Sequence, residues 1–81
     1  MTTKNKIREW LAQGVKQNAT HVIVAVDTFD YDDYPVFVKT SENVHDVYAR
    51  YNGTNMQRVV EVYNLSMDLE AQLAERRAHN F

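Results

Sequence analysis

A chain of 81 residues allows one domain, residues 1–81, close to the lower limit at which a single hydrophobic core suffices. It contains no cysteine, which excludes a disulfide framework, and no apolar run long enough for a membrane span or a signal peptide. The net charge is −2, but residues 21–46 carry six carboxylates against one lysine. Because phosphate contacts need basic groups, this balance argues against a nucleic-acid-binding surface. We therefore expect a soluble cytoplasmic protein that binds neither nucleic acid nor membrane.

The first predicted element is an amphipathic helix over residues 4–17, with Thr3 as its N-cap. Gly14 lies near the apolar face of this helix, where the lack of a side chain permits close approach to a sheet. The apolar positions follow the spacing of one helix face. They are Ile7, Trp10, Leu11 and Val15.

Two strands are predicted next. Residues 20–26 are rich in β-branched side chains and apolar on both faces, so this strand needs cover from two directions. A helix on one face, with an oligomer contact or another helix on the other, would provide that cover. The second strand, residues 35–39, begins with Pro35, which suits an edge position. Residues 27–34 join the two strands as an antiparallel hairpin with a long tip.

A second helix is predicted to begin after Ser41 or Asn43, either of which is a suitable N-cap. It ends at the pair Asn52-Gly53, which is typical of a helix stop. One face of this helix is apolar. The residues on that face are Val44, Val47, Tyr48 and Tyr51.

The last third of the chain, Thr54–Ala78, is predicted to form one long helix. Thr54 and Gln57 match a capping box, and no proline or glycine interrupts the residues that follow. On a helical projection this segment has two apolar stripes on opposing sides, with a polar strip between them that includes Gln72. The second stripe consists of Val62, Leu65, Leu69 and Leu73.

One stripe can cover the core of the chain, and the second stripe then needs a partner. We therefore expect the second stripe to form the interface of a homo-oligomer, most simply a symmetric dimer. The alternative is that the first two helices cover both stripes within one copy. The predicted fold is thus α+β, in the order helix, strand, strand, helix, long helix (αββαα), and it is completed by oligomerisation.

The hairpin tip, Asp27–Pro35, interleaves four carboxylates with three aromatic rings. It lacks the turn glycine and the distal glutamate of an EF-hand loop, so we expect no metal site there. The expected structure is a polar tip whose aromatic rings pack against the domain. Asp30, Asp32 and Asp33 are the candidates for contact with a protein partner.

No constellation of residues indicates catalysis. His21, His45 and His79 fall in three different elements without metal-ligand spacing. No nucleophile motif or phosphate-binding glycine loop occurs. We therefore expect no cofactor and no enzymatic activity, with a small enzyme that uses the aspartate cluster as the catalytic alternative.

A candidate binding site lies where the long helix is predicted to begin. Free N–H groups at a helix start attract anions, arginines add charge-assisted contacts, and tyrosines stack on a nucleotide base. The alternative is simple helix capping together with tyrosines that belong to the core. The predicted ligand-binding residues are Tyr31, Tyr34, Tyr48, Arg50, Thr54, Asn55 and Arg58.

Three stretches, Ala19–Val24, Asp27–Val36 and Asn55–Val59, resemble a group of small bacteriophage-encoded proteins. The resemblance covers most of the chain, and Asp27–Val36 is its most specific part. No functional residue is carried over from that group. What the resemblance implies is a context: small phage proteins of this kind are often accessory factors that blunt host defences in the host cytoplasm, by sequestering nucleotide signals or by blocking a host protein.

The favoured expectation is an oligomeric, non-catalytic binding protein that sequesters a nucleotide-like anion. The first alternative is a protein–protein inhibitor that presents the acidic aromatic tip to a host protein. The second alternative is the small enzyme that uses the aspartate cluster.

Overall fold

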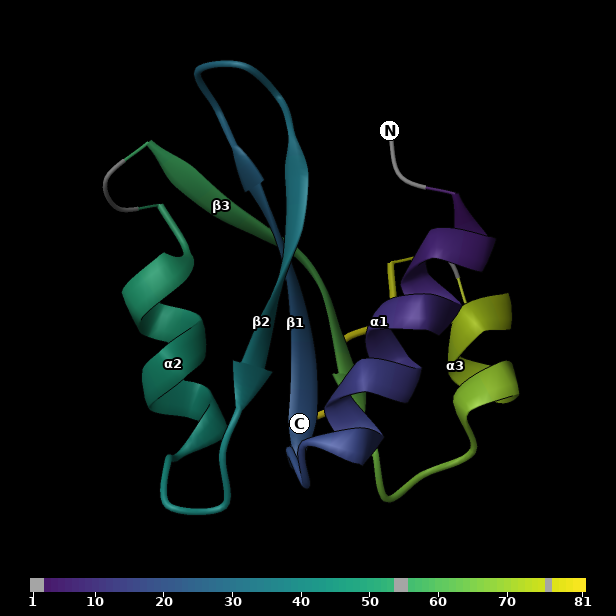
Figure 1. Cartoon of the computed structure of the whole chain (residues 1–81). Helices are drawn as coiled ribbons and strands as arrows, with labels where there is room; N and C mark the ends of the chain where they lie inside the picture. Colours follow the sequence, from purple (N-terminus) through teal and green to yellow (C-terminus); the bar gives the residue numbers. More distant parts are fainter. Residues whose placement is uncertain (1–2, 54–55, 76) are drawn as a thin grey trace.

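A three-stranded antiparallel sheet forms the centre of the molecule, and helices pack on both of its faces (Figure 1). The structure is a computed structural model that describes residues 3–53, 56–75 and 77–81. The elements found in these residues confirm the predicted α+β class. In chain order they are α1 (Lys4–Lys16), β1 (His21–Asp27), β2 (Asp33–Val38), α2 (Val44–Tyr51), β3 (Gln57–Asn64) and α3 (Leu69–Ala74).

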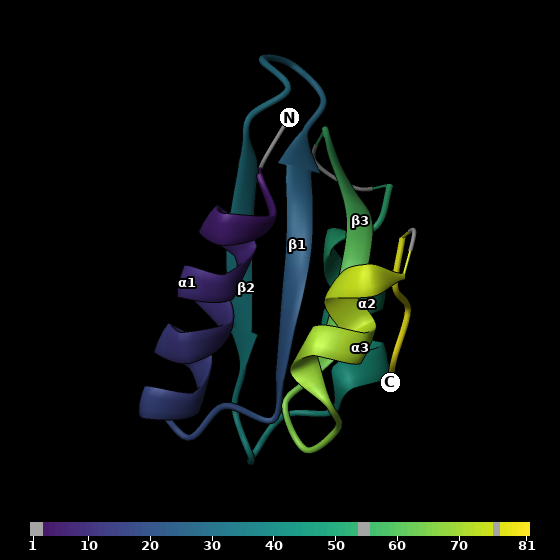
Figure 2. The ribbon, with the colours of Figure 1, turned by 90° about the vertical axis from the view of Figure 1, so that its right-hand side faces the viewer.

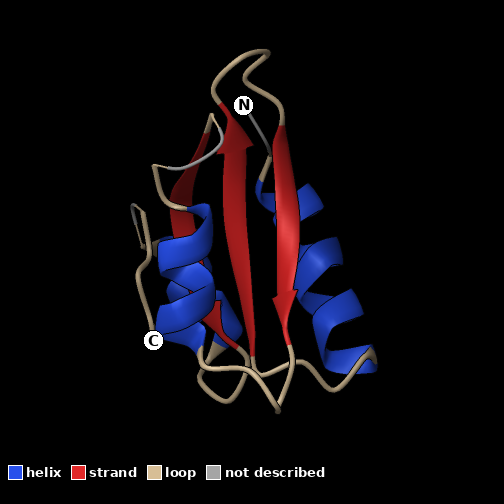
Figure 3. Ribbon diagram, turned by 90° about the vertical axis from the view of Figure 1, so that its left-hand side faces the viewer, coloured by secondary structure: helices blue, strands red, loops and turns tan. Residues whose placement is uncertain are grey.

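β1 is the central strand, with β2 and β3 antiparallel on either side of it. Figure 2 looks onto the face that α1 and α3 cover, and Figure 3 looks onto the face that α2 covers. Residues 22–26 of β1 are all buried. The expectation that this strand needs cover from two directions is therefore confirmed, and a helix supplies that cover on each face.

The first core lies between the sheet and the helices α1 and α3. The one glycine of α1, Gly14, is buried there, and an added Cβ would lie 2.8 Å from Val22 Cγ2 and 2.9 Å from Leu65 Cδ1. The predicted close approach of helix and sheet is therefore confirmed. Val15 is not on the apolar face, because it is 53% exposed. The buried residues of this core are Ile7, Trp10, Leu11, Val22, Val24, Tyr63, Leu73 and Ala78.

The second core lies between the sheet and α2. The side chain of Asn43 accepts hydrogen bonds from the backbone N–H groups of His45 and Asp46, so Asn43 is the N-cap of α2. This cap and the apolar face of the helix fix how α2 lies on the sheet. The buried residues of this core are Ile23, Val38, Val47, Val59 and Val62, with Tyr48 and Tyr51 packed against them.

The predicted long helix over Thr54–Ala78 is wrong. Residues 57–64 form the strand β3, and only the short helix α3 remains of the predicted helix. Thr54, the first residue of the predicted capping box, lies outside the described residues. β3 therefore occupies the part of the chain where we expected the long helix to begin.

A β-bulge explains why β3 resembles a helix in the sequence. Val24 of β1 pairs with Glu61, but its neighbour Ala25 pairs with Val59, so Val60 is an extra residue in the ladder. Such an insertion shifts the alternation of faces by one residue. Apolar residues consequently fall at 59, 60 and 63, a spacing that also fits one side of a helix.

The predicted oligomer interface is not a surface stripe. Val62 and Leu73 are buried, with exposed fractions of 0% and 3%. They belong to different cores on opposite faces of the sheet, because β3 does not continue as a helix into α3. Leu65 and Leu69 are partly buried and pack against the first core. The alternative, in which one copy covers these residues, is therefore the one that the structure supports.

The C-terminal residues 77–81 run along the outer edge of β3 (Figure 2). The N–H of Val62 donates to the carbonyl of Ala78 at 2.8 Å, and the N–H of Asn80 donates to the carbonyl of Val62 at 3.0 Å. The ring of Phe81 stacks on His45 of α2 with centroids 4.5 Å apart. This segment thus links the two faces of the sheet. No helix among the described residues has the length and apolar character needed to cross a bilayer.

Candidate functional site

A hollow of about 620 Å³ opens on the α1 side of the sheet, near the end that carries the hairpin tip. Its apolar lining comes from four elements, namely Ile7 of α1, Val26 of β1, Val60 of β3 and Leu73 of α3. Tyr31 of the hairpin tip adds an aromatic ring to this lining. The charged residues of the lining are Lys4, Asp33, Arg58, Glu61, Glu75 and Arg77.

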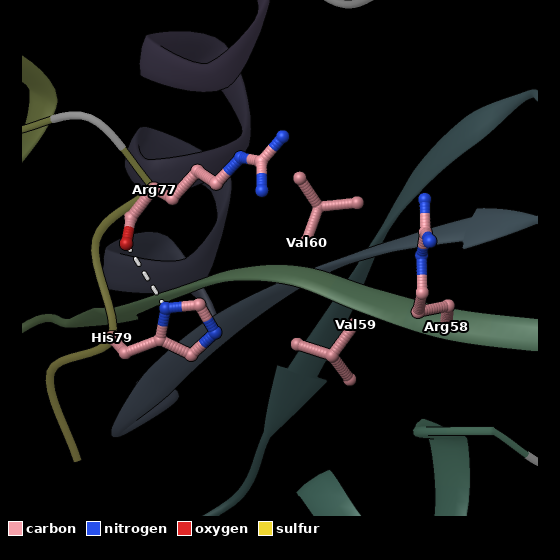
Figure 4. A pocket seen from close by; sticks show the side chains of 5 residues that line it. All are labelled: Arg58, Val59, Val60, Arg77 and His79. Carbon is pink, nitrogen blue, oxygen red and sulfur yellow. Dashed lines mark hydrogen bonds between the residues drawn. The ribbon is translucent and has the colours of Figure 1, made fainter.

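A smaller hollow of about 230 Å³ adjoins it at the outer edge of β3. Figure 4 shows Arg58, Val59 and Val60 on the strand, with Arg77 and His79 on the C-terminal segment beside it. The Nδ1 atom of His79 lies 3.0 Å from the carbonyl oxygen of Arg77. Both hollows share Arg58, Val60 and Arg77, so they form one continuous concave surface, which we call the β3-edge site.

The smaller hollow is positively charged, and its arginines have no partners within the described part of the chain. No ion pair or side-chain hydrogen bond of Arg58 or Arg77 is found among those residues, and both side chains are exposed. Arg8, by contrast, forms an ion pair with Glu70, with its Nη2 atom 2.9 Å from Oε1 of that carboxylate. The hydrogen bond between these two groups raises the pKa of Arg8 and lowers that of Glu70. Two unpaired guanidinium groups beside a histidine are suited to an anion with several oxygen atoms.

Backbone strain is concentrated at the same end of the molecule. Tyr31 and Arg77 adopt left-handed backbone conformations, with φ angles of 61° and 62°. Side chains with a Cβ are disfavoured in this region, and such residues cluster at functional sites. Asn18 and Met56 also have a positive φ, of 59° in each case, and neither lines a hollow. Asparagine tolerates that conformation after a helix. Two residues of the β3-edge site are therefore held in costly conformations.

A short hydrogen bond fixes one carboxylate of the larger hollow. The hydroxyl of Tyr63, a residue that is only 1% exposed, donates to Oε2 of Glu61 at 2.8 Å. Burial, together with the neighbouring carboxylate, raises the pKa of Tyr63 well above its usual range. The tyrosine therefore remains a donor, and it holds Glu61 in one orientation beside the hollow.

The structure brings together only part of the predicted ligand-binding set. Tyr31 and Arg58 both line the larger hollow. Thr54 and Asn55 lie outside the described residues. The idea that a helix start binds the anion is wrong, because a strand follows at residues 57–64.

The remaining predicted ligand-binding residues lie on the α2 side or in β2, away from both hollows. Tyr48 packs against the second core. Arg50 lies 3.9 Å from Glu42. Tyr34 is partly buried in β2, where burial raises its pKa. Tyr48 therefore matches the alternative in which tyrosines of this region belong to the core.

Sequence reasoning missed Arg77 and His79. The available signal was the basic composition of residues 76–79, to which the helical interpretation gave no role. Without the strand β3, nothing indicated that Arg77 and His79 lie beside Arg58. The pairing of Val62 with the C-terminal segment makes them neighbours.

Two of the three aromatic rings of the hairpin tip are exposed, which contradicts the expectation that they pack against the domain, whereas Tyr34 is partly buried. Phe29 is 78% exposed and Tyr31 is 69% exposed. Asp27 and Asp30 each accept a backbone N–H within the tip, at 2.8 and 3.1 Å. The backbone N–H of Thr28 donates to the carbonyl of Met56 at 2.7 Å, which ties the tip to the start of β3.

The described residues contain no group of three or more histidine, cysteine or acidic side chains placed to hold a metal ion. No protein-family model, curated protein or solved structure matches the chain.

Proposed function

We propose that the protein is a non-catalytic binding protein for a nucleotide-like, phosphate-bearing anion, which it holds at the β3-edge site. The observation that carries this proposal is the pair of arginines, Arg58 and Arg77, which lack partners among the described residues and flank a hollow. Both side chains are exposed, so a ligand in the hollow can reach their guanidinium groups. An anionic ligand would supply the counter-charge and form charge-assisted hydrogen bonds with both arginines.

Binding without turnover is proposed from the chemistry of the lining. The described residues that line the two hollows include no serine, threonine or cysteine. They offer charges, one imidazole and one phenol ring, without a nucleophile and base in hydrogen-bond contact. A sequestering role follows from this composition. The resemblance to small phage proteins supports a setting in which removal of a nucleotide signal in the host cytoplasm is useful.

Calorimetry with a panel of anions tests the proposal. Phosphate, pyrophosphate and linear and cyclic nucleotides are titrated into the wild type and into the variants Arg58→Gln and Arg77→Gln. We expect at least one ligand to bind, and each variant to weaken that binding by about tenfold or more, because each removes a charge-assisted contact. Arg50→Gln is the matched control, since Arg50 is exposed and lines neither hollow.

No heat with any member of the panel would rule the proposal out. Equal weakening in the Arg50→Gln control would indicate general charge attraction and would also contradict it. Ligand recovered intact after a long incubation supports binding over catalysis. Conversion of the ligand would instead favour the enzyme alternative.

A second candidate function uses the hairpin tip to dock on a basic protein surface. It is favoured by the exposed rings of Phe29 and Tyr31, which are surrounded by carboxylates. Replacing Asp30, Asp32 and Asp33 with asparagine is expected to abolish capture of a host partner without unfolding the chain. Phe29→Ser should weaken capture at unchanged net charge, which separates docking from simple charge attraction. Unchanged capture by both variants would remove this candidate.

Self-association stays a prediction, as does completion of the fold by oligomerisation. Of the stripe on which we based it, Val62 and Leu73 are buried within one copy, and Leu65 and Leu69 are partly buried. β2 is an edge strand, and Pro35 removes one backbone donor from it, which is typical of edges that avoid pairing.

A further inference from the structure

We infer that the ligand class of the β3-edge site is a nucleoside monophosphate, with its phosphate in the smaller hollow and its base in the larger one. The inference rests on the proposed function and extends it, because it names the parts of the ligand and where each part binds. Three features of the site carry it: the separation of charge, the apolar lining with Tyr31, and the fixed carboxylate of Glu61.

Charge is distributed unequally between the two hollows. Among the described residues, those that line the smaller hollow include Arg58, Arg77 and His79 and no carboxylate. The larger hollow contains three carboxylates, of Asp33, Glu61 and Glu75, which balance Lys4 and the two shared arginines. A phosphate therefore binds favourably at only one end, and a second phosphate that extended into the larger hollow would meet carboxylates.

The larger hollow suits the uncharged remainder of such a ligand. Its volume of about 620 Å³ falls within the usual range of small-molecule sites. Val26 and Val60 provide apolar surface, and Tyr31 presents an exposed ring to it. A flat aromatic base matches this combination, since stacking on a tyrosine adds to apolar burial.

Carboxylates in the larger hollow match the donors that a nucleoside carries. Glu61 uses one oxygen to accept from Tyr63, at 2.8 Å, and its other oxygen has no partner among the described residues. Ribose hydroxyls and exocyclic amino groups donate hydrogen bonds, and an ionised carboxylate only accepts them. The fixed orientation of Glu61 lowers the cost of ordering this contact when the ligand binds.

Four probes divide the ligand into its parts: AMP, ribose 5-phosphate, adenosine and inorganic phosphate. Calorimetry at constant ionic strength is expected to rank AMP first, about tenfold tighter than ribose 5-phosphate, because only AMP adds the stacked base. Adenosine is expected to bind at least about tenfold more weakly than AMP, since it lacks the charge-assisted contacts. ADP is expected to gain nothing over AMP.

Two variants, Tyr31→Asn and Glu61→Gln, test where the base and the ribose of the ligand bind. Tyr31→Asn is expected to reduce AMP affinity to within about threefold of ribose 5-phosphate while leaving ribose 5-phosphate unchanged. Phe29→Asn is the matched control, because Phe29 is an exposed ring of the same tip that lines neither hollow. Glu61→Gln is expected to weaken AMP and ribose 5-phosphate together and to leave phosphate unchanged.

The possible failures are distinguishable. If AMP binds no tighter than ribose 5-phosphate, or if Tyr31→Asn leaves AMP affinity intact, the nucleoside monophosphate is the wrong ligand class, while the anion site of the proposed function stands. If adenosine binds as tightly as AMP, the inference is overturned as well. If none of the probes binds and the wider panel of anions also gives no heat, the proposed function itself fails.

Discussion

Tyr31 has an exposed ring on a backbone with a φ of 61°, a conformation that a bulky residue adopts only at a cost. Asparagine tolerates this conformation better. We therefore expect Tyr31→Asn to increase the free energy of unfolding by about 1 kcal/mol, although it removes a ring from the site. Urea denaturation measures this change, and Phe29→Asn, which relieves no strain, should show no such gain. A destabilised Tyr31→Asn variant would mean that the ring itself stabilises the tip.

Gly14 is a position where a residue with better helix propensity would clash with neighbouring side chains. Alanine is the better helix former by about 1 kcal/mol. Its Cβ, however, would lie 2.8 Å from Val22 and 2.9 Å from Leu65. Overpacking of this kind costs about 1–3 kcal/mol, so we expect Gly14→Ala to lower stability by about 1 kcal/mol. Thermal unfolding compares it with Gln13→Ala, an exposed position on the same helix, and a rise in Tm for Gly14→Ala would contradict the close approach.

His21 makes stability depend on pH. Its Nε2 atom is buried without a hydrogen-bond partner among the described residues. Burial, and to a lesser extent the nearby His45, lowers the pKa of His21 below 6.5. The unfolded chain therefore binds more protons than the folded chain just below pH 6.5, so stability is complete above this pH and falls as the pH decreases through it.

Because His21 is only partly buried, we expect a small loss of stability between pH values of about 8 and about 5. Urea denaturation at the two pH values measures the loss. His21→Gln cannot titrate and should show a smaller pH dependence. An identical slope in this variant would assign the effect to other groups.

At the scale of the elements, the side chain of Gln72 in α3 forms hydrogen bonds with the backbone of β3. Gln72 is 1% exposed, and its amide replaces a strand partner at the end of β3. Its Oε1 accepts from the N–H of Asn64 at 2.7 Å, and its Nε2 donates to the carbonyl of the same residue at 2.9 Å. We expect Gln72→Leu to lower the free energy of unfolding by about 1–3 kcal/mol, since the N–H of Asn64 loses its partner. The carbonyl of Asn64 loses one of two donors and keeps the N–H of Met67, at 3.2 Å.

Denaturant unfolding of Gln72→Leu measures this cost. Gln13→Leu, a change of the same chemistry at an exposed position of α1, is the control. If both variants have the same stability, the buried amide is not the link between α3 and β3.

The first four elements, α1, β1, β2 and α2, could be predicted from the sequence because each has its own local signal. The N-caps Thr3 and Asn43 and the β-branched run of β1 are such signals, and each lies where it was expected. β3 could not be recognised from apolar spacing, because the bulge at Val60 removes the alternation. The run of β-branched residues in it was the one available indication of a strand.

The candidate site was predictable only in part for the same reason. Tyr31 and Arg58 were identified from residue type and local sequence. Arg77 and His79 come from a segment that reaches Arg58 only through pairing with β3. The local spacing of residues does not indicate a long-range contact of this kind. Because β3 was predicted to be part of a helix, Arg77 and His79 were not recognised as part of the site.

The whole molecule has a core on each face of the sheet, and one copy completes both. The alternative without self-association therefore predicts that the chain unfolds in a single transition whose Tm does not depend on protein concentration. Calorimetric scans over about a hundredfold range of concentration test this. A Tm that rises with concentration, together with a dimer in sedimentation, would support the predicted homo-oligomer despite the burial of Val62 and Leu73.

Tyr31 lies in the lining of the larger hollow and also on the surface of the hairpin tip. A ring that stacks on a bound base cannot at the same time insert into another protein. The two candidate functions would therefore compete for one side chain, and each would weaken the other by the same factor, as linkage requires. A small molecule in the hollow would then act as a release signal for whatever the tip holds.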